Sequence, residues 1–408
     1  MTTRRIFLQG LAGGVVIAGG GLLRLPRAWA AVSLGPPSLP SGTLEGAVLE
    51  ALPGKRPLIK RTYRPPNFET PVEHFSEPYT PNDAFFVRYH LPLIPEVGPP
   101  DWRLRIGGAA VERPLELTLE QLQRDFEHVE IAAVCQCSGN RRGLSDPHVP
   151  GVQWGYGAMG NALWQGVRLK DVLSRAGLKK EAVEIVFDGA DSGYSAKTPD
   201  FVKSLPAWKA MDENTLLAWA MNGTLLPHWN GFPLRLVVPG WTATYWLKQL
   251  VSIEAVTSPY QGFWMKTAYR IPKDKFPLVD RFVSQEAEAN TPITEMVVNS
   301  LILSPVEGQQ VAGAAEVRGI AWDGGYGIQR VDVSSDGGQS WYSADLGPDL
   351  GRYAWRQWHY RFTPPQPGRY VLQARATNRL GASQTFTPIF NPAGYHHNAV
   401  HTVTIQSA

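Results

Sequence analysis

The sequence has few cysteines, little net charge and no long apolar run beyond its N-terminal region. Cys135 and Cys137 are the only cysteines in 408 residues, which excludes a disulfide scaffold, a four-cysteine zinc site and a cysteine-ligated iron–sulfur cluster. A single intervening residue places them poorly for an ordinary disulfide. We expect no haem in this chain, because it has no Cys-x-x-Cys-His motif for covalent attachment. The formal net charge of +3 does not predict a nucleic-acid partner.

Turn-forming residues are abundant. The 40 glycines and 34 prolines favour a turn-rich β or mixed architecture over a helical bundle. Hydrophobic residues make up 43% of the chain and charged residues 18%, which are ordinary proportions for a folded protein. At roughly one domain per 150 residues, the length predicts about two to three domains.

The N-terminal region has the pattern of an export signal. Arg4 and Arg5 precede an apolar run over 6–23 that is diluted by glycines, and a small-x-small cleavage site follows at 28–30. We predict a twin-arginine signal peptide over 1–30 and export of the folded protein to the periplasm, often with a cofactor already inserted. A membrane anchor is the alternative, but the run is barely long enough to span a bilayer. No later segment approaches 18 apolar residues, so we do not expect the mature protein to span a membrane.

The rest of the chain divides into stretches of different character. Residues 31–80 are rich in proline and predict an irregular arm lying on the main body. Residues 81–275 mix strand and helix patterns and predict an α+β domain, and 271–291 read as a linker. Short alternating strands without a helical run over 292–408 predict an all-β immunoglobulin-like sandwich. The individual elements expected are strands at 104–106, 184–187, 234–238, 358–362 and 370–376, and helices at 117–126 (capped by Thr118) and 169–176.

The segment Cys137-Ser-Gly-Asn-Arg-Arg142 carries the chemistry. Its small residues let the backbone approach a bulky group closely, and its paired guanidiniums form fixed forks for an anion. A thiolate beside cations has a lowered pKa and suits either a soft metal or nucleophilic attack. A buried cysteine next to solvated surface arginines is the alternative, and the segment alone leaves both open.

This segment and three others, in order, resemble the sulfite oxidase family. The cysteine segment resembles the family's molybdenum-binding loop, and Phe85–His90 resembles its upstream Phe-x-x-Arg-x-His element. Segments 151–167 and 231–240 resemble the continuation after the cysteine and the second cofactor strand. The resemblance extends over about residues 75–405 and is greatest to the bacterial periplasmic sulfite dehydrogenases, whose molybdenum subunit works with a separate cytochrome c. It implies a molybdopterin-binding domain of the sulfite oxidase fold over 81–275, followed by the family's immunoglobulin-like dimerisation domain over 292–408.

The resemblance also implies an activity and a set of site residues. The activity is oxidation of sulfite to sulfate at a molybdenum–molybdopterin centre, with electrons leaving singly to a c-type cytochrome that is either an acceptor or a subunit. Cys137 matches the protein ligand of the molybdenum. Arg88, Arg142 and Trp154 match residues that line the substrate pocket, and Tyr269 matches a tyrosine near the metal oxo group. The residues that match cofactor contacts are Phe86, Val87, Arg88, Tyr89, His90, Asp191, Asn230, Arg235, Trp246, Leu247 and Lys248.

Two positions depart from the family pattern. Asn230 stands where the family often has a histidine, and His228 lies two residues earlier, so which of them contacts the cofactor stays open. Tyr326 stands where the animal enzymes place an arginine near the substrate, so we expect the anion pocket to be completed differently. We expect no cytochrome b5-like domain ahead of the molybdenum domain, and we expect electrons to leave through another protein.

Two further groups are interpreted as structural. Cys135 would point to the same face of a strand as Cys137, but it has no counterpart in the motif. His396, His397 and His401 could bind a metal if the segment were helical. Because a strand-like segment follows them, we favour a turn or a packing surface.

Other functions stay open at this point. One is reduction of sulfoxides by an enzyme of the same fold, although such relatives generally lack the sandwich domain predicted over 292–408. The others are an oxygen-dependent sulfite oxidase and a non-enzymatic binding protein with a vestigial cofactor. The sandwich also allows either a homodimer or a heterodimer with a cytochrome subunit.

Overall fold

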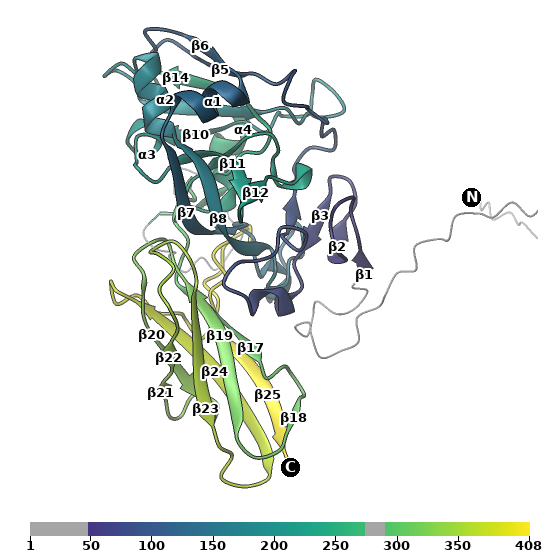
Figure 1. Ribbon diagram of the computed structural model, residues 1–408. Coiled ribbons are helices and arrows are strands. Elements are labelled where there is room, and N and C mark those ends of the chain that lie inside the picture. Colours follow the sequence, from purple (N-terminus) through teal and green to yellow (C-terminus); the bar gives the residue numbers. More distant parts are fainter. Residues whose placement is uncertain (1–47, 274–289) are drawn as a thin grey trace, which may run out of the picture. The chain divides into compact units, whose positions relative to one another are not determined.

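The computed structural model describes residues 48–273 and 290–408 (Figure 1). The signal peptide predicted over 1–30 and most of the linker predicted over 271–291 lie outside the described residues. The described residues belong to one compact unit. Among them, no helix is both long enough and apolar enough to cross a bilayer.

The first described strands form a four-stranded antiparallel sheet. Its order is β1 (Val48–Glu50), β2 (Leu58–Thr62), β3 (Asn67–Glu69) and β4 (Val87–Arg88). The prediction of an irregular arm is therefore wrong for residues 48–69. These strands fit between the prolines, and β3 pairs with a strand about twenty residues later, which local sequence patterns do not indicate.

Two larger sheets make up the rest of the α+β domain. The first has the order β10 (Lys203–Pro206), β9 (Glu184–Gly189), β14 (Leu250–Val256), β5 (Leu104–Gly107), β6 (Leu115–Leu117). The second has the order β12 (Thr224–Leu225), β11 (Leu216–Met221), β8 (Met159–Arg168), β7 (His128–Gln136), and β13 (Arg235–Val237) also pairs with β11. The strands predicted near 104, 184 and 234 are confirmed as β5, β9 and β13.

Four short helices connect these strands. They are α1 (Leu119–Asp125), α2 (Leu169–Ala176), α3 (Ala207–Ala210) and α4 (Phe263–Lys266). The predicted cap of α1 is confirmed: the Gln121 amide donates to Thr118 Oγ1 at 3.1 Å and the Thr118 amide donates to Gln121 Oε1 at 2.8 Å. Single-turn 3-10 segments lie at Val72–Phe75, Arg142–Leu144, His228–Asn230 and Ala243–Tyr245.

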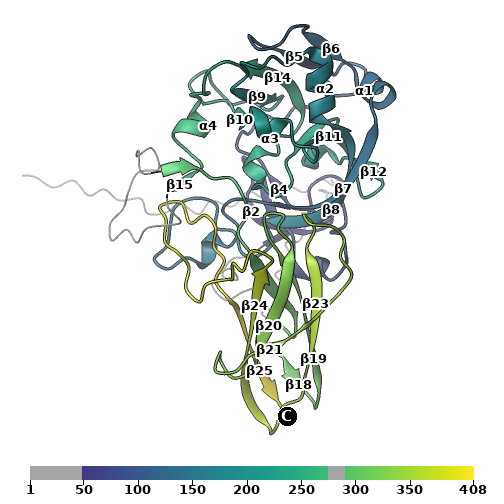
Figure 2. The ribbon, with the colours of Figure 1, turned by 90° about the vertical axis from the view of Figure 1, so that its left-hand side faces the viewer.

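The C-terminal residues form two packed sheets, drawn in green to yellow in Figures 1 and 2. One has the order β17 (Asn299–Ser304), β19 (Ala315–Trp322), β23 (Arg356–Phe362), β22 (Asp345–Leu346). The other has the order β18 (Gln310–Val311), β25 (His401–Ser407), β24 (Gly368–Asn378), β20 (Ile328–Ser334), β21 (Tyr342–Ser343). Alternate residues such as Val317, Leu372 and Val403 from both sheets share one apolar core. The predicted immunoglobulin-like sandwich is confirmed, and a small pair of β15 (Arg270–Pro272) and β16 (Asn290–Pro292) precedes it.

The sandwich packs on the α+β domain through a shared apolar cluster. Val134 and Met159 of β7 and β8 belong to the same buried cluster as Ile320 and Trp322 of β19. The Trp322 indole N–H donates to Gln136 Oε1 at 2.5 Å, one residue before Cys137. The end of β7 is therefore held from both domains.

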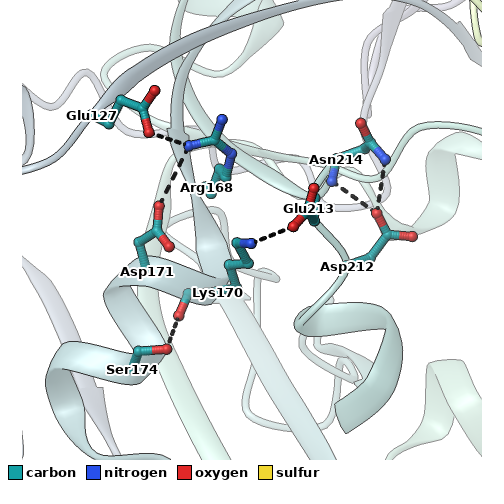
Figure 3. A network of polar contacts seen from close by, with 8 residues as sticks. All are labelled: Glu127, Arg168, Lys170, Asp171, Ser174, Asp212, Glu213 and Asn214. Atoms are coloured by element: carbon teal, nitrogen blue, oxygen red, sulfur yellow. Dashed lines mark hydrogen bonds and ion pairs between the residues drawn. The ribbon is translucent and has the colours of Figure 1, made fainter.

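Charged side chains at the junction of β8 and α2 form ion pairs at the surface (Figure 3). Arg168 lies between Glu127 and Asp171, with its Nη1 2.5 Å and 3.8 Å from their carboxylate oxygens. Lys170 Nζ lies 2.8 Å from Glu213 Oε1 (Figure 3). Solvent-exposed pairs of this kind contribute about 0–1 kcal/mol each, so we treat them as support for α2 rather than as a site.

Candidate active site

One cavity of the α+β domain collects most of the residues singled out in the sequence. Three cations, one histidine and both cysteines line it, together with small polar and aromatic side chains. No aspartate or glutamate is among the described residues that line it. The lining residues are Phe85, Phe86, Arg88, His90, Cys135, Cys137, Ser138, Phe201, Trp229, Asn230, Arg235, Ala243, Thr244, Trp246, Lys248 and Tyr269.

Cys137 is the first residue after strand β7, and its loop folds back on strand β8. The Cys137 amide donates to the Ala158 carbonyl at 2.9 Å, and the Ala158 amide donates to Asn140 Oδ1 at 3.0 Å. Gly139 leaves room for Arg142, since a Cβ at this position would lie 2.3 Å from Arg142 Nη2. The small residues of the motif therefore let this loop close tightly while the Cys137 side chain, 6% exposed, lines the cavity.

Strand alternation divides the predicted run 86–90 into two faces. The side chains of Phe86, Arg88 and His90 line the cavity. Val87 and Tyr89 instead belong to a separate buried cluster with Leu58 and Phe68. The side chains of Val87 and Tyr89 therefore point away from the cavity, because successive residues of a strand point to opposite faces, and a cofactor contact at these two positions stays a prediction.

The same division applies to the run 246–248. Trp246 and Lys248 line the cavity, whereas Leu247 is a core residue, 2% exposed, that does not line it. Lys248 Nζ donates to the Arg88 carbonyl at 2.8 Å. Burial lowers the pKa of Lys248 to about 8, and Asp191 opposes this shift. Asp191 is 8% exposed and lies near Lys248 without lining the cavity.

Asn230, rather than His228, lines the cavity. Its Oδ1 accepts a hydrogen bond from Lys55 Nζ at 2.5 Å, and its Nδ2 donates to the Phe86 carbonyl at 3.1 Å. Burial lowers the pKa of Lys55 to about 7. Arg235 lies beside Asn230, with its Nη1 donating to the Asn230 carbonyl at 2.9 Å.

Tyr269 has the most constrained geometry in the site. Its φ is +59°, a left-handed conformation that a tyrosine adopts only when its surroundings hold it there. Its hydroxyl contacts His90 Nε2, and the His90 ring stacks on Phe201 at 3.7 Å between centroids. Burial raises the pKa of Tyr269, and the positive charges of Arg88 and Arg142 oppose this shift.

Arg142 and Trp154 are not among the residues that line the cavity. Arg142 Nε donates to the Ala393 carbonyl at 2.7 Å, and its Nη1 donates to the Val152 carbonyl at 3.1 Å. Trp154 is fully buried, and within the described part of the chain its indole N–H has no hydrogen-bond partner. Both residues were predicted at the substrate pocket. The structure brings the charge of Arg142 close enough to act on Tyr269.

Cys135 lines the same cavity as Cys137. Its sulfur lies 3.9 Å from Arg235 Nη2, and burial raises the pKa of its thiol to about 11. The interpretation of Cys135 as a purely structural residue is therefore incomplete: it faces the site next to a predicted cofactor-binding arginine.

Three site residues were missed because no local pattern marks them. Lys203 is 1% exposed, and its Nζ lies 5.1 Å from the centroid of the Tyr269 ring. Tyr395 stacks on Tyr269 from the sandwich domain. Lys55 comes from the segment expected to be an irregular arm. Each is distant in sequence from the motif residue that it contacts, so an isolated lysine or tyrosine carried no signal.

Tyr326 and the three C-terminal histidines lie outside the cavity. Tyr326 is 38% exposed, and its hydroxyl donates to Glu295 Oε2 at 2.7 Å. His401 Nδ1 accepts from the Ile302 amide at 3.0 Å. In the described ranges no group of three or more histidine, cysteine or acidic side chains is arranged to hold a metal. These positions agree with the packing interpretation of the histidines.

Unpaired polar atoms in the cavity fit a cofactor with many heteroatoms. Arg88 Nε, Ser138 Oγ, Arg235 Nε and Thr244 Oγ1 are buried and have no hydrogen-bond partner among the described residues. Buried polar atoms are normally paired, and a pterin with a phosphate supplies acceptors for such donors. A single thiol as the soft donor also suits a metal that takes its other ligands from the cofactor.

Comparisons with known proteins agree with this site. Residues 90–264 match the family model of an oxidoreductase molybdopterin binding domain, and residues 290–408 match that of a Mo-co oxidoreductase dimerisation domain. The mitochondrial sulfite oxidase of Homo sapiens is 35% identical over 370 residues, which cover 86% of this chain and 66% of that protein. The chain thus spans just under two thirds of the human protein's length.

Two further relatives match over more of their own length. The sulfite oxidase of Gallus gallus is 33% identical over 367 residues, covering 86% of this chain and 78% of that protein. The crystal structure of the sulfane dehydrogenase SoxCD from Paracoccus pantotrophus superposes with a TM-score of 0.70 at 28% identity, covering 83% of each chain.

Proposed function

Because the chain belongs to the sulfite oxidase family of molybdopterin oxidoreductases, we propose that it oxidises sulfite to sulfate and passes the electrons singly to a separate c-type cytochrome. The observation that carries this proposal is a buried cavity lined by Cys137, three cations and no carboxylate among its described residues. Such a cavity suits an anionic cofactor together with a small anionic substrate, since charge pairs strengthen where water is excluded.

The cofactor would be held by residues on opposite sides of this cavity. Arg235, Lys248, Ser138 and Thr244 would bind the phosphate and the pterin, because two of them are cations and three carry unpaired buried donors. Cys137 would supply the thiolate ligand to the metal. When bound, the molybdenum cofactor supplies oxygen-atom and two-electron chemistry that no side chain provides.

Arg88, Arg142 and Tyr269 would bind and orient the substrate. The two guanidinium charges both act on Tyr269, so an anion near its hydroxyl would be held by two cations at once. Burial keeps Tyr269 a neutral phenol by raising its pKa, and burial with nearby cations keeps His90 a neutral imidazole by lowering its pKa. The phenol proton can therefore be shared with His90 Nε2, which leaves the oxygen able to exchange a proton with substrate or water.

The test uses one preparation of the purified protein. Molybdenum content is measured by elemental analysis, and reduction of cytochrome c is followed on addition of sulfite. We expect about one molybdenum per chain and sulfite-dependent reduction that is lost in Cys137→Ser. A molybdenum-loaded protein that does not reduce cytochrome c with sulfite would contradict the proposal.

Three parallel assays separate the competing activities. Hydrogen peroxide formation with sulfite would indicate oxygen as the acceptor, and turnover of a sulfoxide with an artificial donor would indicate a reductase. A sulfane-sulfur substrate is also tested, because the similar Paracoccus enzyme is a sulfane dehydrogenase. We expect sulfite to give the highest kcat/KM.

We also propose that the chain is exported through the twin-arginine route to the periplasm. The support is the pair Arg4 and Arg5 with the apolar run and cleavage site that follow. Replacing both arginines with lysine should retain the protein in the cytoplasm, as measured by cell fractionation. Normal periplasmic yield of the double variant would refute this assignment.

A further inference from the structure

Tyr395 belongs to the sandwich domain, yet its ring packs against two predicted catalytic residues. Its ring is parallel to that of Tyr269, with 10° between the planes and 5.5 Å between the centroids. The Arg142 guanidinium carbon lies 5.4 Å from the centroid of the same ring. Tyr395 is 6% exposed, so these contacts are shielded from water.

The segment that carries Tyr395 is locked to the Cys137 loop by hydrogen bonds. The Ala393 carbonyl accepts from Arg142 Nε at 2.7 Å, and the His396 amide donates to the Ser138 carbonyl at 3.3 Å. Asn391 brackets Tyr395 itself, accepting from its amide at 2.9 Å and donating to its carbonyl at 2.8 Å. These hydrogen bonds fix the backbone that places the Tyr395 ring against the site.

Gly394 shows how closely this segment approaches the catalytic loop. Its φ is +59°, and a Cβ there would lie 2.6 Å from Val149 Cγ2 and 3.0 Å from Arg142 Cγ. A side chain at this position would push the segment away from Arg142, so the close approach requires glycine.

The conformation of Tyr269 depends on packing contacts such as the one with the Tyr395 ring. Its backbone is in the left-handed region, where a tyrosine is held only by its neighbours. His90 contacts its hydroxyl at one end. The Tyr395 ring covers its flat side, and the same ring keeps Arg142 beside it. Without Tyr395, the Tyr269 ring and the Arg142 guanidinium would both lose a rigid neighbour.

The two stacked rings line different hollows. Tyr269 lines the cavity with Cys137, whereas Tyr395 lines a second hollow with Asn391, Gly394 and His397. Removing the Tyr395 ring would open the space behind Tyr269 to this second hollow. Water entering there would weaken the hold of Arg142 on an anion.

We propose that Tyr395 is a positioning residue of the catalytic pocket, through which the sandwich domain holds Tyr269 and Arg142 in their working geometry. Tyr395 is the sandwich-domain side chain that reaches the pocket, whereas Tyr326 lies at the surface. The expected effect on kinetics rests on the proposed function, whereas the effect on the geometry of Tyr269 and Arg142 does not. The dimerisation domain is then also a part of the active site.

The experiment compares Tyr395→Met, which removes the ring but keeps most of the volume, with Tyr395→Phe, which keeps the ring. Tyr326→Met is the matched control, because it removes an exposed tyrosine of the same domain. Molybdenum content, melting temperature, and kcat and KM for sulfite with an artificial electron acceptor are measured for each. We expect Tyr395→Met to lower kcat/KM at least tenfold with full molybdenum content, and Tyr395→Phe and Tyr326→Met to stay within threefold of the wild type.

Three results would overturn the proposal. One is kcat/KM within threefold of the wild type in Tyr395→Met, and another is an equal loss in Tyr395→Phe, which would assign the role to the hydroxyl. The third is a crystal structure of a Tyr395 variant with unchanged Tyr269 and Arg142 side chains. If Tyr395→Met does not fold, Tyr395→Leu takes its place with the same expectations. If the wild type does not oxidise sulfite, the proposed function fails while the crystal structure still decides the positioning.

Discussion

The neighbouring arginines of the cysteine motif should differ in their effect on the substrate, and Arg141 offers the sharper test. Arg141 is 1% exposed, with Nη2 donating to the Ser300 carbonyl at 2.7 Å and Nη1 donating to the Ala399 carbonyl at 3.1 Å. Its guanidinium carbon also lies 4.7 Å from the centroid of the Tyr156 ring. Both arginines thus bond the loop to the sandwich, but only the charge of Arg142 also acts on Tyr269.

The magnitude for Arg141→Met follows from these contacts. The buried Ser300 carbonyl loses this donor, at about 1–3 kcal/mol, whereas the Ala399 carbonyl still accepts from Gln384 Nε2 at 3.3 Å. The loss of a desolvated cation–π contact adds about 1–2 kcal/mol. Burial lowers the pKa of Arg141 to about 10, so its charge is itself costly to bury. Methionine removes this cost, which offsets part of the loss. We expect the free energy of unfolding to fall by about 2–4 kcal/mol.

The assay measures denaturant unfolding by circular dichroism and sulfite kinetics below the unfolding transition. Arg141→Met should lower the unfolding midpoint and leave the KM for sulfite within threefold of the wild type. Arg142→Met should also lower the midpoint, because the Ala393 and Val152 carbonyls lose a donor, but unlike Arg141→Met it should raise the KM for sulfite well beyond threefold. If Arg141→Met loses less than about 1 kcal/mol, or raises KM as Arg142→Met does, the division of roles is wrong.

Three other changes test the site. Cys137→Ser should keep the fold but lose molybdenum and turnover, because an alkoxide replaces a soft thiolate poorly; near-normal turnover would contradict this. At pH 6, where Lys203 with its pKa of about 7 is charged, Lys203→Met should raise the KM for sulfite several-fold with little change in kcat, since it removes a buried cation beside Tyr269; an unchanged KM would show that the charge does not act on the substrate. Lys55→Met should lower cofactor retention, measured as molybdenum per chain after dialysis, because Asn230 loses the donor that fixes its amide; full retention would show that Asn230 is held without it.

The stability of the cofactor-free protein should also depend on pH, as a consequence of buried lysines. Burial lowers the pKa values of Lys203 and Lys55 from 10.5 to about 7. Between pH 7 and 10.5 the unfolded chain binds more protons than the folded chain, so the free energy of unfolding rises with pH, by up to about 1.4 kcal/mol per unit and group. Denaturant titrations at pH 7, 8 and 9 should show this rise, and Lys203→Met should make the slope shallower, with Lys55 supplying the remainder. An equal slope in the variant would refute the assignment to Lys203.

The order of motifs along the chain was enough to predict the fold class, the family and the central thiol. Local rules also sufficed for the cap of α1, where Thr118 and Gln121 are three residues apart and bond to each other. The loop at Cys137 was predictable for the same reason, since its small residues and arginines act within a few positions of one another. These features depend on short-range sterics and hydrogen bonds, which a linear pattern records.

Tertiary structure alone decided which members of each motif face the cavity and what completes it. Val87 and Tyr89 point into a separate apolar cluster while Arg88 points into the cavity, because the two faces of the strand at β4 pack against different parts of the protein. Lys55 and Tyr395 come close to the site from segments far along the chain in opposite directions. A contact between residues so distant in sequence depends on how the sheets pack and on the path of the loops between strands. A single lysine or tyrosine forms no periodic sequence pattern that would predict such a contact. The cysteine motif therefore indicated the chemistry, and the packing of two domains determined the shape of the pocket in which it would occur.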